Sequence, residues 1–225
     1  MLSTSDLTFI EKKGITAEMI DAQLKRFEVG FPFLKINAVA TIGNGIKAFS
    51  PEETAACVKA WSDFQQTGKA IEKFVPASGA ASRMFKNMFA FASSGKDAPT
   101  TDFEKEYFEN ITKFAFYADL NNACRKLYRS NVQELMSAGR YVDVVKAMLE
   151  PEGLNYGFLP KALLKFHKTT GGNAHTPLEE HLEEGAQYAA DKNRKVNLHF
   201  TVSPEHKAEF EKLLTAKLPI YEQVW

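Results

Sequence analysis

Apolar side chains recur every three or four residues over several stretches of the chain, which is the spacing of amphipathic helices. In the N-terminal part this spacing predicts a helix over residues 16–28. A second helix is expected over residues 50–66, where Ser50 and Glu53 have the spacing of a capping box. Residues 1–70 are therefore expected to form a mainly helical N-terminal extension.

Two later segments follow the patterns of strands. Residues 71–76 are short, largely apolar and end at a proline, and residues 196–202 alternate apolar and polar side chains with period two. A helical block in two or three pieces is predicted between them, over residues 102–149. Strands separated by helices imply a parallel sheet of the α/β class. A stable open sheet has about four to six strands, so either further strands escape the pattern or the chain is the front part of a longer protein.

The remaining periodic segments predict three more helices. One covers residues 83–91, directly after a turn of small residues. Another covers residues 176–191 and opens with a capping box, and a third covers residues 203–216. Residues 169–175 are rich in glycine and polar side chains and are expected to be a flexible loop.

Composition excludes several classes of protein. The 225 residues are 44% hydrophobic and 25% charged, which is ordinary for a globular domain with a core. The 28 basic and 28 acidic residues give a formal net charge of zero, so the excess of positive charge that is typical of nucleic-acid binders is missing. No apolar stretch approaches the ~20 residues of a membrane span. Two distant cysteines, Cys57 and Cys124, fit a reducing compartment. We therefore expect a cytoplasmic protein that binds neither nucleic acid nor membrane.

A run of small residues joins the predicted strand at 71–76 to the helix that follows. Short side chains allow a ligand to approach the backbone, and the amide groups at a helix start favour an anion. Arg83 adds a guanidinium group, which suits phosphate oxygens. The alternative is a tight turn in which small residues only allow strand and helix to pack. The candidate nucleotide-binding residues are Pro76, Ala77, Ser78, Gly79, Ala80, Ala81 and Ser82.

Four segments resemble, in order, the motifs of nucleotidyltransferases of the sugar-phosphate pyrophosphorylase superfamily. Residues 75–84 resemble the signature loop, and residues 159–164 resemble the second motif of that superfamily. Residues 176–181 resemble the helix start that follows, and residues 196–206 resemble the next strand and helix. More closely, the chain resembles the N-terminal half of an uncharacterised bacterial family of unknown function that is similar to these enzymes.

This resemblance implies a Rossmann-like, GT-A-type parallel sheet that is incomplete in this chain. Residues 71–225 would be the nucleotide-binding α/β domain, with a large helical insertion at about 100–150. The implied activity is transfer of NMP from an NTP to a phosphorylated small molecule such as a sugar phosphate. The backbone of residues 78–82 would hold the nucleotide, Arg83 would contact the triphosphate, and Lys161 would steady charge on the α-phosphate. Mg²⁺ is expected with the NTP, although its ligand is not identified in this chain.

The chain departs from the superfamily pattern at four points. The helical block between Arg83 and Lys161 is far longer than the usual short loop. Ala81 occupies the position of the second glycine, Ala162 replaces a proline, and no acidic strand that could hold Mg²⁺ follows Val202. The alternative function is a non-catalytic module that binds a nucleotide or a protein on the same fold. The sequence leaves the oligomeric state open.

Histidine and glutamate side chains gather over residues 175–184. His175 and His181 have no tight metal-ligand spacing with the neighbouring glutamates. Acidic side chains in a first helical turn complement the helix dipole. We therefore interpret this segment as a solvated helix face.

Overall fold

The structure, a computed structural model, describes residues 2–224 of the chain, with side chains described to residue 222. Its contacts divide the chain into two compact units, Met1–Ala55 and Ala56–Trp225. Helix α3 (Pro51–Gln65) begins in the first unit and continues into the second. The expected boundary at residue 70 falls within the second unit.

The first unit has little core of its own. It contains helices α1 (Thr4–Lys12) and α2 (Ala17–Val29) and a short strand pair, β1 (Thr41–Ile42) with β2 (Gly45–Ile46). Within its described residues, Ile10 is the one buried hydrophobic side chain. The predicted helix over 16–28 is confirmed as α2, whereas α1 was not predicted.

Helix α3 begins at the predicted capping box and ends in contact with a later helix. The Ser50 hydroxyl accepts the Glu53 amide at 3.2 Å, and the Glu53 carboxylate accepts the Ser50 amide at 3.0 Å. Further along, the Trp61 indole N–H donates to the carbonyl of Tyr188 at 2.7 Å. The Gln65 amide donates to the carbonyl of Ala190 at 2.8 Å. The C-terminal part of α3 is therefore held by hydrogen bonds to backbone far along the chain.

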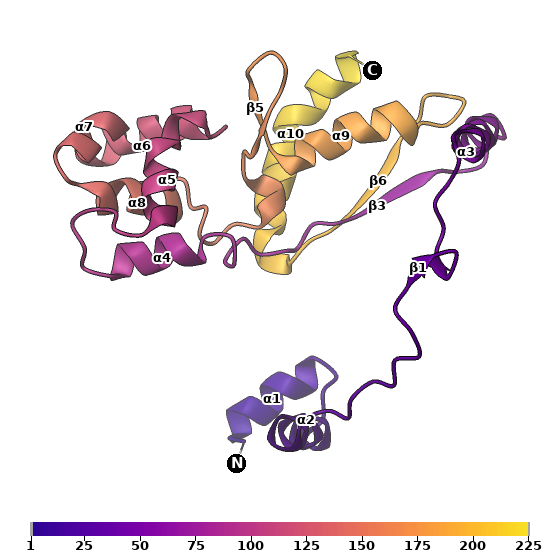
Figure 1. Ribbon diagram of the computed structural model, residues 1–225, viewed down its shortest axis with the longest axis horizontal. Helices are drawn as coiled ribbons and strands as arrows, with labels where there is room; N and C mark the ends of the chain where they lie inside the picture. The colour runs from indigo at the N-terminus through magenta and orange to yellow at the C-terminus, as the bar shows by residue number, and fades with distance from the viewer. Residues whose placement is uncertain (1, 225) are drawn as a thin grey trace. The chain divides into compact units, whose positions relative to one another are not determined.

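The two predicted strands exist and pair in parallel. They are β3 (Glu72–Pro76) and β6 (Asn197–Thr201), which run side by side in Figure 1. Val75 pairs in register with Phe200, and its side chain is buried. The neighbouring pair, Phe74 and His199, lies on the opposite face, where the two exposed rings stack with centroids 5.0 Å apart. The sheet thus has one buried face and one exposed face.

The buried face of the sheet packs against α9 (Pro177–Tyr188) and α10 (Lys207–Val224). The start of α9 is the predicted capping box, in which the Thr176 hydroxyl accepts the Glu179 amide. Helix α10 follows the short 3₁₀ helix η3 (Pro204–His206) and is longer than predicted. The buried members of this small core are Val75, Ala77, Ala162, Leu178 and Phe210.

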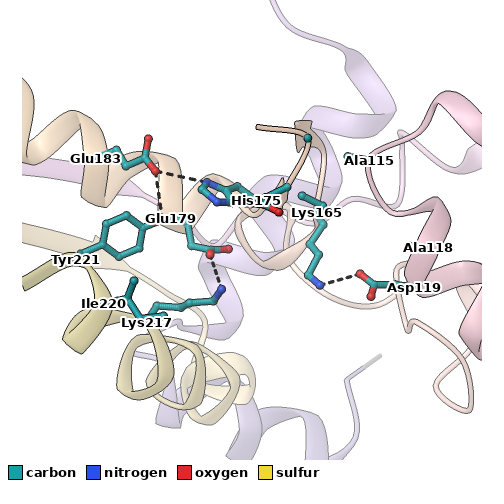
Figure 2. Close-up of a pocket in the computed structure, with 13 residues that line it drawn as sticks. Ala115, Ala118, Asp119, Lys165, His175, Glu179, Glu183, Lys217, Ile220 and Tyr221 are labelled. Carbon is teal, nitrogen blue, oxygen red and sulfur yellow. Dashed lines mark hydrogen bonds and ion pairs between the residues drawn. The ribbon is translucent and has the colours of Figure 1, made fainter. Parts of the chain in front are cut away.

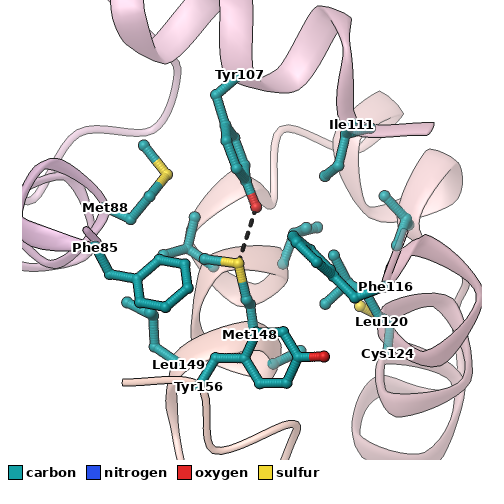
Figure 3. Close-up of a cluster of buried hydrophobic side chains, with 14 of the residues drawn as sticks. Phe85, Met88, Tyr107, Ile111, Phe116, Leu120, Cys124, Met148, Leu149 and Tyr156 are labelled. Carbon is teal, nitrogen blue, oxygen red and sulfur yellow. Dashed lines mark hydrogen bonds between the residues drawn. The ribbon is translucent and has the colours of Figure 1, made fainter. Parts of the chain in front are cut away.

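The helical block has the larger of the two cores (Figure 3). Helix α8 (Tyr141–Leu149) lies at its centre and packs against α4 (Lys86–Ser93), α6 (Tyr117–Tyr128) and α7 (Val132–Ser137). Val144, Val145 and Met148 on α8 are fully buried, and the Tyr107 hydroxyl donates to the Met148 sulfur at 3.1 Å. The predicted helical block over 102–149 is confirmed, with four α-helices in place of the two or three pieces expected. These are α5 (Asp102–Glu109), α6, α7 and α8, with the 3₁₀ helix η1 (Ile111–Lys113) after α5, and α4 precedes them.

A 3₁₀ helix and a hairpin connect the helical block to α9. The 3₁₀ helix η2 (Lys161–Leu163) contacts α9. Strands β4 (His167–Lys168) and β5 (Ala174–His175) then pair antiparallel. The segment 169–175, expected to be a loop throughout, therefore ends in the second strand of this hairpin. Across residues 2–224, no helix has both the length and the apolar composition that crossing a membrane requires.

The start of α5 makes the stability of the second unit sensitive to acid. Amide N–H groups of Thr101 and Thr100, together with the ammonium group of Lys96, lower the pKa of the buried Glu104 from 4.5 to about 2. A lowered folded-state pKa contributes stability that is complete above the ordinary value and is lost as the pH falls from about 4.5 towards about 2.

We expect Glu104→Gln to lower the urea midpoint at neutral pH and to lose most of that deficit near about pH 3, because Glu104 of the unfolded wild-type chain takes up its proton at the ordinary pKa. Glu109→Gln, an exposed change on the same helix, is the matched control. A deficit of Glu104→Gln that stays constant with pH would contradict the assignment.

Candidate functional site

The predicted small-residue loop leaves the end of β3 beside β6. The Ala77 amide donates to the carbonyl of Thr201 at 2.9 Å, so the chain stays paired with β6 for one residue beyond the strand. The Ala77 side chain is buried in the core below the sheet. Ser78, Gly79 and Ala80 are then exposed. The loop thus has a fixed base and an accessible outer side.

The structure brings this loop together with the Lys161 segment. Ala80 and Pro160 form an antiparallel bridge, and the Lys161 amide donates to the carbonyl of Gly79 at 3.0 Å. Lys161 is the first residue of η2 and is exposed, whereas the next residue, Ala162, is buried against the core below the sheet. Two segments far apart in sequence, each carrying a predicted site residue, are therefore joined by backbone contacts.

Several backbone amides of the loop point to no acceptor within the part of the chain that the structure describes. A backbone N–H group without a protein acceptor is satisfied by water or by a ligand. Successive unpaired amides form a concavity that favours anions. The residues concerned are Ser78, Gly79, Ala80, Ser82 and Arg83.

The placement of Arg83 corrects the sequence prediction. Helix α4 begins at Lys86, so the expectation that Arg83 starts a helix is wrong. The amides of Met84 and Phe85 both donate to the carbonyl of Ala81, at 2.9 and 3.3 Å, which closes a separate turn. Ala81 and Phe85 are buried and anchor this turn, which leaves Arg83 exposed on its outer side.

The two small residues at the centre of the loop have different roles. Ala81, at the position where the superfamily pattern has a glycine, is 1% exposed and belongs to the core of the helical block. Its methyl group therefore contributes to packing. Gly79 has no positive φ, and a Cβ built there would meet nothing within 4 Å. Neither packing nor backbone conformation requires a glycine at that position.

The two predicted catalytic residues, Arg83 and Lys161, are exposed, and each lies on one of the two joined segments. Neither side chain has an ion-pair or hydrogen-bond partner among the residues described. Pro76 is the exposed last residue of β3, and Ser82 is exposed in the turn before α4. The local sequence could predict each segment, but it could not predict the bridge between Ala80 and Pro160.

A cavity of about 760 Å³ lies elsewhere in the second unit and was not predicted (Figure 2). Lys165 pairs with Asp119 at 2.7 Å on one side of it. On the other side, Lys217 pairs with Glu179 at 2.7 Å. Its lining residues are Ala115, Ala118, Asp119, Lys165, Gly172, Asn173, Ala174, His175, Glu179, Glu183, Lys217, Ile220 and Tyr221.

The interpretation of residues 175–184 as a solvated helix face is wrong for its central glutamate. Glu179 is 2% exposed, because its carboxylate turns back to cap α9 and to pair with Lys217 on α10. Burial raises the pKa of Glu179, but the hydrogen bonds from Lys217 and Thr176 outweigh it, so the pKa lies below its ordinary value.

Tyr221 and His175 line the same cavity beside further carboxylates. Burial, followed by the charges of Glu179 and Glu183, raises the pKa of the Tyr221 hydroxyl. His175 Nδ1 lies 3.4 Å from a carboxylate oxygen of Glu180 and 3.5 Å from one of Glu183. The sequence signal for this grouping was the dense run of glutamates after His175, but the contribution of α10 could not be predicted from it.

A separate charged group lies where α9 meets β3. The Lys73 ammonium pairs with the Glu184 carboxylate, which His181 also contacts at 3.1 Å. The pair with Lys73 is the main reason that the pKa of Glu184 is lowered to about 2. This pair fastens α9 to the sheet.

The described residues do not supply a preformed metal centre. Across residues 2–224, no group of three or more histidine, cysteine, aspartate or glutamate side chains has the geometry to hold a metal ion. Mg²⁺ often binds through substrate phosphates with one or two carboxylates. None of residues 2–224 is therefore assigned as a ligand of Mg²⁺.

Comparison with known proteins gives one match. A family model described as a domain of unknown function (DUF4301) matches residues 3–225. Comparison with curated proteins found no match, and comparison with solved structures found none.

Proposed function

This chain belongs to the protein family described as a domain of unknown function (DUF4301), and we propose that it binds the nucleoside triphosphate of a nucleotidyl transfer reaction. The NMP group would move to a phosphorylated small molecule such as a sugar phosphate. The proposal takes the parallel pair β3–β6 as part of a Rossmann-like, GT-A-type sheet into which the helical block is inserted.

One observation carries the proposal: the hydrogen bond from the Lys161 amide to the Gly79 carbonyl, next to the bridge between Ala80 and Pro160. This contact places a cation-bearing segment against a loop whose outer amides lack an acceptor among residues 2–224. Amide groups, a guanidinium and an ammonium are the donors that bind phosphate oxygens in proteins. The open space beside Gly79 allows a ligand to approach the backbone closely.

The proposed reaction needs charge neutralisation more than a strong base. A phosphate oxygen of the acceptor attacks the α-phosphorus of the NTP, and the bond from that phosphorus to the bridging oxygen of the β-phosphate breaks. Pyrophosphate then leaves with the electron pair of that bond. The attacking oxygen is already an anion, so catalysis rests on positioning and on stabilising charge. Arg83 would bind the triphosphate, and Lys161 would offset charge at the α-phosphate. The NTP is expected to enter as its Mg²⁺ complex.

Removing either cation is expected to weaken NTP binding by at least about tenfold, because hydrogen bonds to charged groups contribute about 1.5–3 kcal/mol. We would measure binding of each Mg²⁺–NTP to the full chain by calorimetry, with the shift in thermal unfolding as a second readout. Arg83→Ala and Lys161→Ala are the test variants. Arg125→Ala and Lys105→Ala, which remove exposed cations from α6 and α5, are the matched controls.

Gly79→Ala provides a sharper test of the loop itself. A Cβ at this position meets nothing within 4 Å, so the variant should unfold like wild type. If phosphates lie against the Gly79 backbone, the same methyl group obstructs them and binding falls. Binding that is unchanged in Gly79→Ala, Arg83→Ala and Lys161→Ala would contradict the proposal. Binding without release of pyrophosphate from any acceptor mixture would favour the non-catalytic module.

A further inference from the structure

A second cavity, of about 510 Å³, opens on the helical block and has a different character from the charged one. Most of its wall is aromatic or sulfur-bearing, and Figure 3 shows the buried members Phe85, Met88, Tyr107 and Phe116. Phe103 reaches it from α5 and is 45% exposed. A concave site of this size, lined by apolar rings with few polar groups, is typical of small-molecule binding.

Some residues in the wall of this cavity follow closely, along the chain, the two segments of the proposed phosphate site. Met84 and Phe85, in its wall, directly follow Arg83. Phe166, also in its wall, lies shortly after Lys161, and its ring is 6.5 Å from that of Phe85. Since the bridge between Ala80 and Pro160 joins the two segments, both lead from the loop into the same cavity.

One charged side chain interrupts the apolar lining. Glu106 on α5 lines the cavity, is exposed, and has no partner for its carboxylate among residues 2–224. Asn110 also lines it, but its amide group already donates to the Glu106 backbone carbonyl at 2.8 Å. The wall therefore combines faces for stacking with a carboxylate that accepts hydrogen bonds.

We infer that this cavity holds the base of the nucleotide and selects guanine, an inference that rests on the proposed function. Flat aromatic bases stack on aromatic side chains, and this stacking contributes to binding. A carboxylate can accept two parallel N–H groups, and guanine presents two adjacent ones, N1–H and the N2 amino group. Adenine, cytosine and uracil offer a single donor group on the corresponding edge. An acyl chain would fill the apolar wall but would offer the Glu106 carboxylate no hydrogen-bond donor.

The experiment measures binding of GTP, ATP, guanosine and inorganic tripolyphosphate to the full chain. We expect GTP to bind at least about tenfold more tightly than ATP, the discrimination that a bidentate base contact provides. Glu106→Gln should bring the two affinities close together, because the amide replaces one acceptor with a donor. Glu109→Gln, on the same helix and outside the cavity, should leave the preference unchanged. Phe103→Leu should weaken guanosine binding.

The results separate this inference from the proposed function. Tripolyphosphate binding that depends on Arg83 and Lys161, without any preference among bases, would overturn the inference and leave the phosphate site standing. Guanosine binding that depends on Glu106, with no effect of the cation variants, would support the base site and contradict the phosphate site. The inference would be overturned if the preference for GTP over ATP were the same in wild type and Glu106→Gln. It would also be overturned if a fatty acid displaced GTP and guanosine did not.

Discussion

Leu120→Ala is expected to lower the free energy of unfolding of the second unit by about 3–5 kcal/mol. Leu120 lies on α6 and is 0% exposed, in the same core as Cys124 and Met148 (Figure 3). Truncation removes buried methyl groups and leaves a cavity, because the surrounding helices relax only partly. The free energy of unfolding of a folded protein is about 5–15 kcal/mol, so this single change removes a large fraction of it.

Urea unfolding followed by far-ultraviolet circular dichroism measures this loss. Leu218→Ala, a change of the same size at an exposed position on α10, should cost about 1 kcal/mol or less. A similar loss from both variants would show that the helical block does not carry most of the stability. This result bears on function, because the same block forms the wall of the proposed base site.

Local signals accounted for much of the secondary structure. The starts of α3 and α9 were predicted because a capping box lies within four consecutive residues, and the alternation over 196–202 predicted β6. The same kind of signal could have predicted α1, where Ser3 and Asp6 form a capping box. The hairpin β4–β5 was not predicted, because strands of two residues are too short to show a periodic pattern.

The errors arose where packing overrode local pattern. Arg83 follows small residues and precedes an amphipathic segment, which is typical of a helix start. Burial of Ala81 and Phe85 instead closes a separate turn and delays α4 to Lys86. Glu179 reads as a solvated glutamate in a first helical turn, but α10 covers it. Such tertiary contacts join residues that no window of sequence contains.

The small-residue loop combines features that the local sequence predicts with a tertiary contact that it does not predict. Its small residues and its cation can be read from residues 76–83, and the resemblance to nucleotidyltransferases connected it with the Lys161 segment. The bridge between Ala80 and Pro160 is a tertiary contact between segments far apart in the sequence, so no local pattern could predict it. The aromatic cavity was not predicted for the same reason, since its rings come from α5 and from turns and connecting segments far apart in the sequence, where each is typical of ordinary core.

The second large effect is expected from Lys217→Met, which should destabilise the second unit by about 3 kcal/mol at neutral pH. Lys217 on α10 is the cation that pairs with Glu179, whose side chain is 2% exposed (Figure 2). Methionine keeps much of the side-chain volume but leaves the glutamate charge buried without its partner. Uncompensated buried charge is costly, whereas a neutral group at the same place is tolerated.

The pH dependence identifies the cause of that loss. In wild type the pKa of Glu179 is lowered, so the pair contributes stability above the ordinary carboxyl range and loses it as the pH falls. Without Lys217, burial should raise the pKa of Glu179, so protonation in mild acid removes the buried charge. The deficit of Lys217→Met should therefore shrink as the pH is lowered.

Two further variants complete the test of this ion pair. Lys212→Met, an exposed change on the same helix, should have little effect at any pH. Glu179→Gln combined with Lys217→Met should recover much of the stability at neutral pH, because glutamine keeps an oxygen that can cap α9 and carries no charge. A double variant as unstable as Lys217→Met alone would show that lost packing of the lysine stem, rather than the buried charge, causes the effect. Urea midpoints for the four chains across the acid range decide between these causes.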